Sequence, residues 1–548
     1  MKGLQGADMD DSLVEVLRLL RLAQAGQPEQ ALAQAEEQLR ADESVGILYA
    51  RAVALGCLGD HEGAAGTAER MRALAIGSGE TAGTAPIGTA TAGWQSIALS
   101  FRACQHMRLA EMDPRSFDQE SVLEDLVEAE AALSHDLTDR FVLASAHTGI
   151  GIGYHDLRLY ELARPHYQAA FDVATTPSTE LAVETAVKSQ LNLAEMHLSW
   201  SVELYRIGDL PGAREQSAIA ARHAVLAQEN ANTDRMQFYA AHAALLEVCA
   251  DSTGGNDDQI AARIRGCLQA VDRRSKRDSR AFALPFLARA LDRAGRHSEA
   301  IDIATQACQA LPEDASWLVA SAAYHTRAVL FARSGSDSAR TGLAYGDELA
   351  KTLWRQRLRT LHNARSVQIL GRVTLERDRV HVLAHTDALT GVGNRRAFDV
   401  RVAELARSGA ESAEVAMIVV DVDRLKAIND AGGHQAGDLT LQAVAGALSG
   451  EVRAQDLVAR LGGDEFVAVL EGMSHPDAAA LAARVVDAVS AALGSTVTVS
   501  VGVATGSAAE AGAGLLRSAD RAMYAAKRAS RVSLSEAEAP QLAQSLTG

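Results

Sequence analysis

The first two thirds of the chain consist of apolar, Ala- and Leu-rich stretches of helical length, with few segments that alternate as strands do. These stretches extend from about residue 10 to residue 312 and are separated by short polar turns. Apolar patterns longer than about ten residues favour helices over strands. The pattern therefore predicts an all-α region over residues 1–312.

A short signature marks the turns between these stretches. It occurs at residues 25–31, 58–64, 157–163, 207–213 and 294–300. Its second position is usually glycine, which we expect to end the preceding helix in a left-handed cap. An alanine four or five residues later is expected to open a second, closely packed helix. The signature therefore predicts helical hairpins.

The spacing of the signature resembles that of the tetratricopeptide repeat, whose unit is about 34 residues of helix–turn–helix. Gly26 and Gly59 lie 33 residues apart, and Arg158 lies three such periods further on. The later intervals break the period, and residues 76–92, rich in Gly, Thr and Ala, are expected to form an inserted loop. The resemblance implies a concave surface that binds a protein or peptide partner. The alternative is a purely structural or dimerising scaffold.

Residues 313–385 are expected to continue as connector helices, with an interruption near residues 334–338. The apolar positions after residue 361 fall at spacings of three and seven: Val367, Leu370, Val373 and Val380. This spacing suits a two-stranded coiled coil, although Arg377 interrupts it. The alternative is one amphipathic helix that packs on its own domain.

The last third changes to short apolar runs that alternate with helical segments. The expected strands are residues 415–420, 456–461, 466–470 and 496–505, and the expected helices are 396–407, a segment ending at 448, 475–493 and 515–530. Such a mixture predicts an α/β domain. We assign residues 386–535 to this domain and residues 536–548 to a C-terminal tail.

Within this domain, Gly462, Gly463, Asp464 and Glu465 lie between two apolar runs. A glycine pair between two strands predicts a hairpin, because tight hairpin turns need positive φ angles. Adjacent carboxylates repel each other, so folding alone seldom selects them. A bare turn lets backbone N–H groups approach an anion, while an acid beside it can hold a divalent cation. The turn therefore indicates a nucleotide phosphate site, with a solvated acidic turn as the alternative.

Composition limits the classes of partner. The formal net charge is −17, so the chain lacks the excess of basic residues that non-specific binding to nucleic acid or membranes needs. The five cysteines are scattered and form no CxxC pair, so neither a zinc site nor a disulfide framework is expected. The N-terminus lacks the apolar segment of a signal peptide, and no apolar run approaches the ~18 residues of a membrane span. We expect a cytoplasmic protein.

Six motifs follow one another in the last third: DALTGVGNRRAF, DVDRLKAIND, GHQAGD, RLGGDEF, TVSVGVA and ADRAMYAAK. In this order they resemble the GGDEF domain of diguanylate cyclases. The resemblance implies a central, mostly antiparallel sheet flanked by helices, akin to adenylate cyclase and polymerase palm domains. It also implies an enzyme that condenses two GTP molecules into cyclic di-GMP and releases two pyrophosphates.

The resemblance assigns roles to the matching residues. Asp421, Asp464 and the Val422 carbonyl would hold two Mg²⁺ ions per active site, with Mn²⁺ as an alternative, because hard cations prefer oxygen ligands. Asp464 would also be the catalytic base for the attacking 3′-hydroxyl, and Glu465 would support the metal site. Asn429 and Asp438 would recognise guanine. The phosphates would be held by Lys426, Lys527 and Arg531, with backbone N–H groups near Leu425 and Gly463.

Two further expectations follow from the family. Each domain carries one GTP, so the reaction needs two domains face to face, which favours a homodimer and the coiled-coil interpretation of the connector. Arg453 and Asp456 match the family's RxxD inhibitory site, where arginine and aspartate bind the product cyclic di-GMP. The alternative for this pair is a surface ion pair.

The sequence thus predicts a diguanylate cyclase controlled by a helical N-terminal array. Its substrate and product would be GTP and cyclic di-GMP, and the array would bind a protein or peptide. The alternative is a non-catalytic receptor for GTP or cyclic di-GMP, or a scaffold, that signals through the array.

Overall fold

The computed structural model contains two compact units, Met1–Arg372 and Val373–Gly548. The structure describes residues 11–24, 26–80, 89–113, 115, 118–133, 139–174, 180–233, 236–250, 256–272, 277–311, 315–407, 414–494, 497–508 and 513–530.

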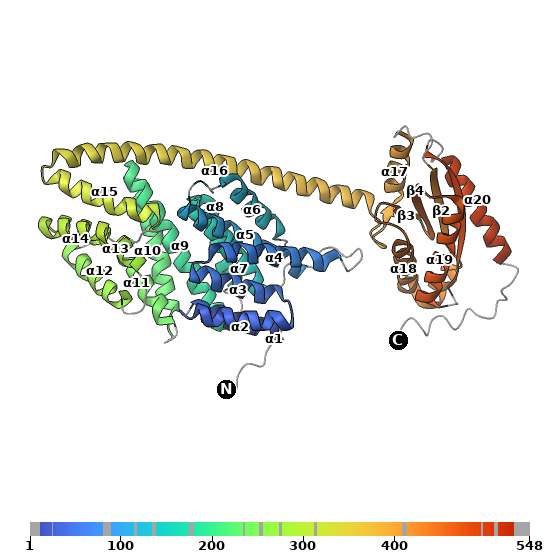
Figure 1. Cartoon of the computed structure of the whole chain (residues 1–548), viewed down its shortest axis with the longest axis horizontal. Helices are drawn as coiled ribbons and strands as arrows, with labels where there is room; N and C mark the ends of the chain where they lie inside the picture. The colour runs from blue at the N-terminus through green and yellow to red at the C-terminus, as the bar shows by residue number, and fades with distance from the viewer. Residues whose placement is uncertain are drawn as a thin grey trace. The chain divides into compact units, whose positions relative to one another are not determined.

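In the described residues of the first unit, the regular elements are all helices, which confirms the all-α prediction (Figure 1). Its helices are α1 (Asp11–Gln24), α2 (Pro28–Ala41), α3 (Val45–Leu58), α4 (His61–Glu80), α5 (Thr89–Met112), α6 (Gln119–Ala132), α7 (Arg140–Asp156), α8 (Tyr160–Ala174), α9 (Glu180–Ile207), α10 (Leu210–Asn230), α11 (Gln237–Ala250), α12 (Asp257–Asp272), α13 (Arg277–Arg293), α14 (His297–Gln309), α15 (Trp317–Arg333) and α16 (Asp337–His385), the last of which continues into the second unit. From α1 to α15, each helix packs against the next one along the chain. Within the described ranges, none of the helices combines the length and the apolar composition needed to cross a bilayer.

The turns between helices have the predicted left-handed glycines. Gly26, Gly59, Gly208 and Gly295 adopt φ angles of 88°, 81°, 89° and 77°. Arg158 adopts the same conformation with φ 63°, which is unfavourable for a residue with a side chain. Its guanidinium is held by the buried carboxylate of Glu203, with Nε 2.8 Å from Oε1, and lies 4.3 Å from the Trp317 ring centre. These hairpins agree with a tetratricopeptide-like array, which itself stays a prediction.

The inserted loop predicted for residues 76–92 is wrong at both ends. Helix α4 extends to Glu80 and α5 begins at Thr89, while residues 81–88 lie outside the described residues. Gly77 and Gly79 do not end α4, which continues beyond the buried Ala75. Helix α5 has Ala90 and Ala92 in its first turn, and alanine has the highest helix propensity of all residues.

In the described part of the second unit, five strands form one sheet in the order β1-β3-β4-β2-β5. Its elements are β1 (Gly393–Asn394), α17 (Arg395–Arg407), β2 (Glu414–Val422), α18 (Leu425–Glu451), β3 (Leu457–Gly462), β4 (Glu465–Glu471), α19 (His475–Leu493), β5 (Val499–Ser507) and α20 (Ala513–Ser530). Only the short β1–β3 pair is parallel; β2 pairs antiparallel with both β4 and β5, as β3 does with β4. The mostly antiparallel sheet implied by the family resemblance is thus present.

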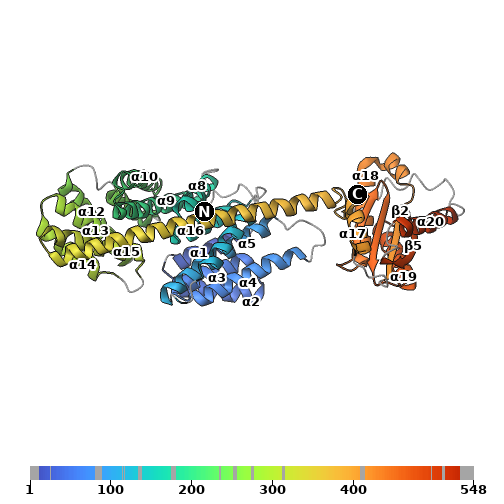
Figure 2. The ribbon, with the colours of Figure 1, turned by 90° about the horizontal axis from the view of Figure 1, so that it is seen from above.

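Helices cover both faces of this sheet (Figures 1 and 2). Helices α18 and α19 pack on the face that carries Ile418 and Val420, whereas α17 and α20 pack on the face that carries Met417 and Val419. Because its successive side chains enter two cores, β2 is an almost unbroken apolar run. This strand is therefore covered on both faces, and it ends with Asp421 and Val422, which were predicted as metal ligands.

Candidate active site

The end of β2 and the β3–β4 hairpin bring three acids to one edge of the sheet. Asp421 pairs with Glu465 across the antiparallel β2–β4 ladder, and the Val422 N–H donates to the Asp464 carbonyl at 3.0 Å. Gly462 and Gly463 have φ angles of 146° and 59°, so the turn needs both glycines. The hairpin predicted from the glycine pair is confirmed.

This edge concentrates negative charge. Burial raises the pKa of Asp421, as do Asp464 and Asp423, while the ion pair with Lys527 of α20 opposes the shift. Burial also raises the pKa of Glu465, and the neighbouring Asp421 and Asp464 add to it. Carboxylates in such a group favour a bound cation, since each hinders the ionisation of the others. Lys527 supplies one positive charge to the edge.

Asp423, also on this edge, was assigned no role from the sequence. Its carboxylate accepts hydrogen bonds from Thr498 Oγ1 and Ser500 Oγ, each at 2.7 Å. These bonds fix the loop after β2 to strand β5. The alternating acids of DVD are the signal that could have indicated it, because alternate residues of a strand share a face.

Arg460 is a second residue that sequence reasoning missed. Its Nε and Nη2 donate to the Gly463 carbonyl at 3.0 and 2.7 Å, and its Nη1 lies 3.2 Å from Asp387 Oδ1. Burial raises the pKa of Asp387, but hydrogen bonds from Thr390 and Arg460 outweigh it and hold the pKa below its usual value. Arg460 thus fixes the glycine turn to the DALTG segment.

The two residues expected to recognise guanine lie on either side of a kink in α18. The helix breaks at Gly433, with φ 76° and ψ 172°. A Cβ at Gly437 would lie 2.0 Å from Asn429 Oδ1, so the absence of a side chain at Gly437 lets Asn429 approach. Asp438 follows Gly437 directly and is exposed. The kink and the glycine therefore bring Asn429 near Asp438.

The expected phosphate-binding residues lie in different surroundings. Leu425 and the exposed Lys426 open α18, where the first backbone N–H groups have no helical acceptor. Gly463 is exposed at the hairpin turn, and Lys527 is engaged by Asp421. Arg531 lies outside the described residues.

Arg453 and Asp456 form a small turn ahead of β3. The Arg453 N–H donates to Asp456 Oδ2 at 3.1 Å, and the Asp456 N–H donates to the Arg453 carbonyl at 3.0 Å. In the described part of the chain, the two side chains form no ion pair, and the buried Oδ1 of Asp456 has no hydrogen-bond partner. The turn therefore leaves the guanidinium of Arg453 exposed, without an ion pair to Asp456.

The donor set at the acidic edge fits a metal ion that also binds substrate. Among the described residues, no group of three or more His, Cys, Asp or Glu side chains is arranged so that it could hold a metal ion by itself. Asp421, Asp464 and the Val422 carbonyl offer oxygen donors of two kinds. Mg²⁺ usually binds one or two carboxylates and completes its shell with water and substrate phosphates. The arrangement suits that mode.

Residues 384–533 match the protein family described as "Diguanylate cyclase, GGDEF domain". Diguanylate cyclase TpbB of Pseudomonas aeruginosa is 41% identical over 172 residues, which are 29% of this chain and 40% of that protein. Diguanylate cyclase DgcP of the same species is 37% identical over 155 residues, covering 27% of this chain and 23% of that protein. The chain thus spans less than half the length of these curated relatives.

A solved structure also resembles the C-terminal part: the coiled coil and GGDEF domain of DgcB from Caulobacter crescentus, in complex with c-di-GMP. It is 29% identical, covers 31% of this chain and 93% of that chain, and has a TM-score of 0.29. The family match coincides with the unit that carries the acidic edge, the glycine hairpin and the kinked helix. Residues 384–533 of this chain are therefore a GGDEF domain of the diguanylate cyclase family.

Proposed function

We propose that this chain is a diguanylate cyclase, which joins two GTP molecules into cyclic di-GMP and releases two pyrophosphates. The observation that carries the proposal is the placement of Asp421 and Asp464 at one edge of the sheet, beside Lys527, within a domain of this family. Phosphoryl transfer depends on positioning and on neutralising charge, and this edge offers groups for both.

The residues of the site have distinct roles in this reaction. Two divalent ions, Mg²⁺ or Mn²⁺, held by Asp421, Asp464 and the Val422 carbonyl would neutralise the phosphate charge. The 3′-oxygen of one GTP bonds to the α-phosphorus of the other as the bond to pyrophosphate breaks. The Asp464 carboxylate accepts the proton of the 3′-hydroxyl, and Glu465 supports the site.

Substrate recognition divides between base and phosphates. Asn429 and the exposed Asp438 bind guanine, because a carboxylate accepts hydrogen bonds from the N1–H and N2–H groups that adenine lacks. Cationic side chains and turn amides bind the phosphates: Lys426, Lys527 and Arg531, with the backbone near Leu425 and Gly463.

The reaction needs two domains, because each binds one GTP. Leu370, Val373 and Val380 of α16 are 67%, 60% and 54% exposed. They are not packed on their own domain, which leaves them available to a second copy of α16 in a coiled coil. We infer that the enzyme acts as a homodimer.

The direct test is incubation of the purified chain with GTP and Mg²⁺, with cyclic di-GMP and pyrophosphate measured by chromatography. We expect two pyrophosphates for each cyclic di-GMP. GTP binding without product, at concentrations that favour dimers, would instead support the receptor function.

Contacts between the N-terminal array and α16 support control of the enzyme by the array. Arg357 of α16 has a side chain only 1% exposed; its Nε donates to the Arg158 carbonyl at 2.7 Å, and its Nη2 pairs with Glu161. Further along α16, Gln368 Nε2 donates to Glu130 Oε2 at 2.7 Å. These contacts hold the helix on α6 and α8, so a partner that binds the array would change the position of α16.

Replacing Arg357 by methionine should loosen this attachment. The substitution leaves Glu161 and the Arg158 carbonyl without their partner, which destabilises the N-terminal unit by about 1 to 3 kcal/mol. Amide hydrogen exchange in the first half of α16 should become faster, and GTP turnover should change. Arg359→Met, which alters an exposed arginine of the same helix, is the control. Turnover and exchange equal to those of the control would contradict control through this contact.

Arg453→Ala should weaken product inhibition. The exposed guanidinium of Arg453 would bind a guanine or a phosphate of cyclic di-GMP, and the Asp456 carboxylate would accept from the guanine N–H groups. The concentration for half inhibition is expected to rise about tenfold or more, as for the loss of a charge-assisted contact. Turnover without product should stay unchanged, because Arg453 lies outside the acidic edge. An unaltered inhibition curve would refute the role.

A further inference from the structure

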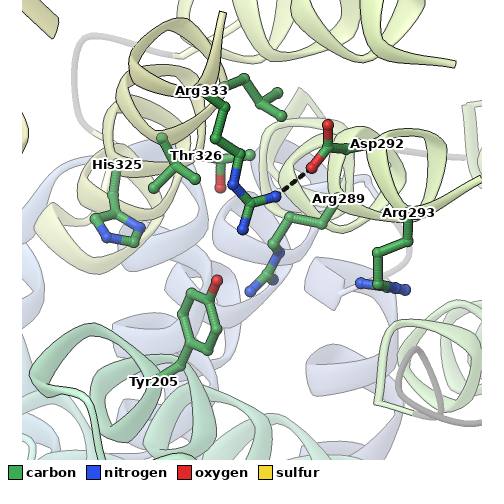
Figure 3. Close-up of a pocket in the computed structure, with 9 residues that line it drawn as sticks. Tyr205, Arg289, Asp292, Arg293, His325, Thr326 and Arg333 are labelled. Atoms are coloured by element: carbon green, nitrogen blue, oxygen red, sulfur yellow. Dashed lines mark hydrogen bonds and ion pairs between the residues drawn. The ribbon is translucent and has the colours of Figure 1, made fainter. Parts of the chain in front are cut away.

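A pocket in the N-terminal unit lies between α9, α13 and α15 (Figure 3). It is lined by Tyr205, Arg289, Asp292, Arg293, His325, Thr326, Val329, Leu330 and Arg333. The pocket encloses about 80 Å³. A cavity needs about 10 to 15 Å³ of such volume to hold one water molecule, so this pocket has room for roughly five to eight non-hydrogen atoms. That is enough for a small ion or the charged group of a small metabolite.

Arg289 contributes a positive charge that lacks an acidic partner. Its guanidinium lies 4.5 Å from the Phe286 ring centre and 5.1 Å from that of Tyr205, and its Nε lies 3.4 Å from the Pro285 carbonyl. Figure 3 shows the Tyr205 hydroxyl directed toward it. In the described part of the chain, it makes no ion pair with a carboxylate. Burial lowers the pKa of Arg289, yet a guanidinium remains protonated in proteins.

The other charges of the pocket do not compensate for Arg289. Arg333 pairs with Asp292, which also accepts from His297 Nδ1 at 2.8 Å, and Arg293 Nε pairs with Asp257 at 2.8 Å. Burial and nearby Arg206 lower the pKa of His325 to about 4, so its imidazole is neutral near pH 7. The lining therefore has three guanidinium groups and one carboxylate, in a chain whose net charge is −17.

We propose that this pocket binds a small anion that carries a phosphoryl or carboxylate group, with Arg289 as its principal contact. A guanidinium binds either group through two parallel hydrogen bonds, which are stronger than neutral ones. The hydroxyls of Tyr205 and Thr326 offer further donors, and Val329 and Leu330 provide an apolar wall for the body of the ligand. The site is separate from the nucleotide chemistry of the GGDEF domain.

The pocket also adjoins the connector helix. His325 Nε2 lies 3.5 Å from Asp347 Oδ1 of α16, and its ring meets that of Tyr205 edge-on at 5.9 Å. An anion bound to Arg289 would thus contact residues that in turn contact α16. This places the site where a small metabolite could act on the helix that leads to the GGDEF domain.

The test is isothermal titration of the full chain with inorganic phosphate and, separately, with malonate, at an ionic strength held constant with sodium chloride. We expect saturable binding of at least one ion: phosphate binding assigns a phosphoryl ligand, and malonate binding a carboxylate ligand. Arg289→Met should weaken this binding by about tenfold or more, because a charge-assisted contact is lost. Asp292→Asn should strengthen it severalfold, since it removes the lone carboxylate of the lining.

The two variants are expected to change the affinity for the anion in opposite directions. A general loss of folding, or binding to the lysines of the nucleotide site, would not produce this result. Arg115→Met is the control, because the Arg115 side chain lies outside the pocket and is 91% exposed. This variant should bind the anion with the same affinity as the unaltered chain. The absence of saturable binding for both ions, or equal affinity in the unaltered chain and both pocket variants, would overturn the proposal.

Discussion

Replacing Asp464 by alanine is expected to reduce cyclic di-GMP synthesis by about a thousandfold or more, because in the proposed reaction it removes a metal ligand and the base for the 3′-hydroxyl together. The fold should be retained. The Asp464 carboxylate adds to the burial that raises the pKa of its neighbours Asp421 and Glu465. Loss of one charge should therefore leave the unfolding midpoint of the C-terminal unit unchanged or raise it. Initial rates with saturating GTP and Mg²⁺, together with thermal unfolding, measure both effects.

A matched control for this variant is Asp487→Ala, which removes an exposed acid of α19 in the same unit. It changes the net charge equally but lies on a helix that supplies no residue to the site. Its turnover should equal that of the unaltered chain. If Asp464→Ala retains turnover close to that of Asp487→Ala, the assignment of Asp464 is wrong.

Gly502→Ala should destabilise the C-terminal unit. A Cβ at this position of β5 would lie 2.2 Å from both the Ala519 carbonyl oxygen and the Met523 backbone nitrogen of α20. Backbone atoms of a helix cannot turn aside as a flexible side chain can, so α20 must shift as a whole. Overpacking of this kind destabilises by about 1 to 3 kcal/mol, and sometimes by more. Urea unfolding of the full chain would measure the loss.

The same variant should also lower turnover, because α20 carries Lys527, the partner of Asp421. Gly446→Ala, in α18, is the control: a Cβ there meets nothing within 4 Å. Since alanine favours helix over glycine, this control should stabilise the unit by about 0.5 to 1 kcal/mol. Equal stability of the two variants would show that α20 does not depend on Gly502 for its position.

Much of the local structure could be predicted from neighbouring residues. Left-handed turns at Gly26 and Gly59 and the hairpin at Gly462 and Gly463 were expected from glycine alone, because few other residues tolerate positive φ. Helix α19 begins at His475 and ends at Leu493, as its apolar pattern predicted. Residues 76–92 show the limit: glycines suggested a loop, but α4 continues through Gly77 and Gly79 and α5 begins at Thr89.

The contacts that make the site were beyond prediction from the pattern. Lys527 meets Asp421 across 106 residues, Arg460 meets Asp387 across 73, and Arg357 meets Glu161 across 196. Each contact depends on which face of a helix or strand turns toward which neighbour, and no local period contains that information. The uncompensated charge of Arg289 is of the same kind, since a lone arginine in a helix has nothing unusual in its sequence.

The sequence by itself determined the helical array, the α/β domain and the order of the motifs, because turns, periods and short motifs depend on residues a few positions apart. Only the tertiary structure decided that Lys527 pairs with Asp421, that Gly437 makes room for Asn429, and that α16 is held by Arg357. The physical reason is that burial and charge pairing act through space between distant segments, and their strength depends on a packing arrangement that exists only in the folded chain.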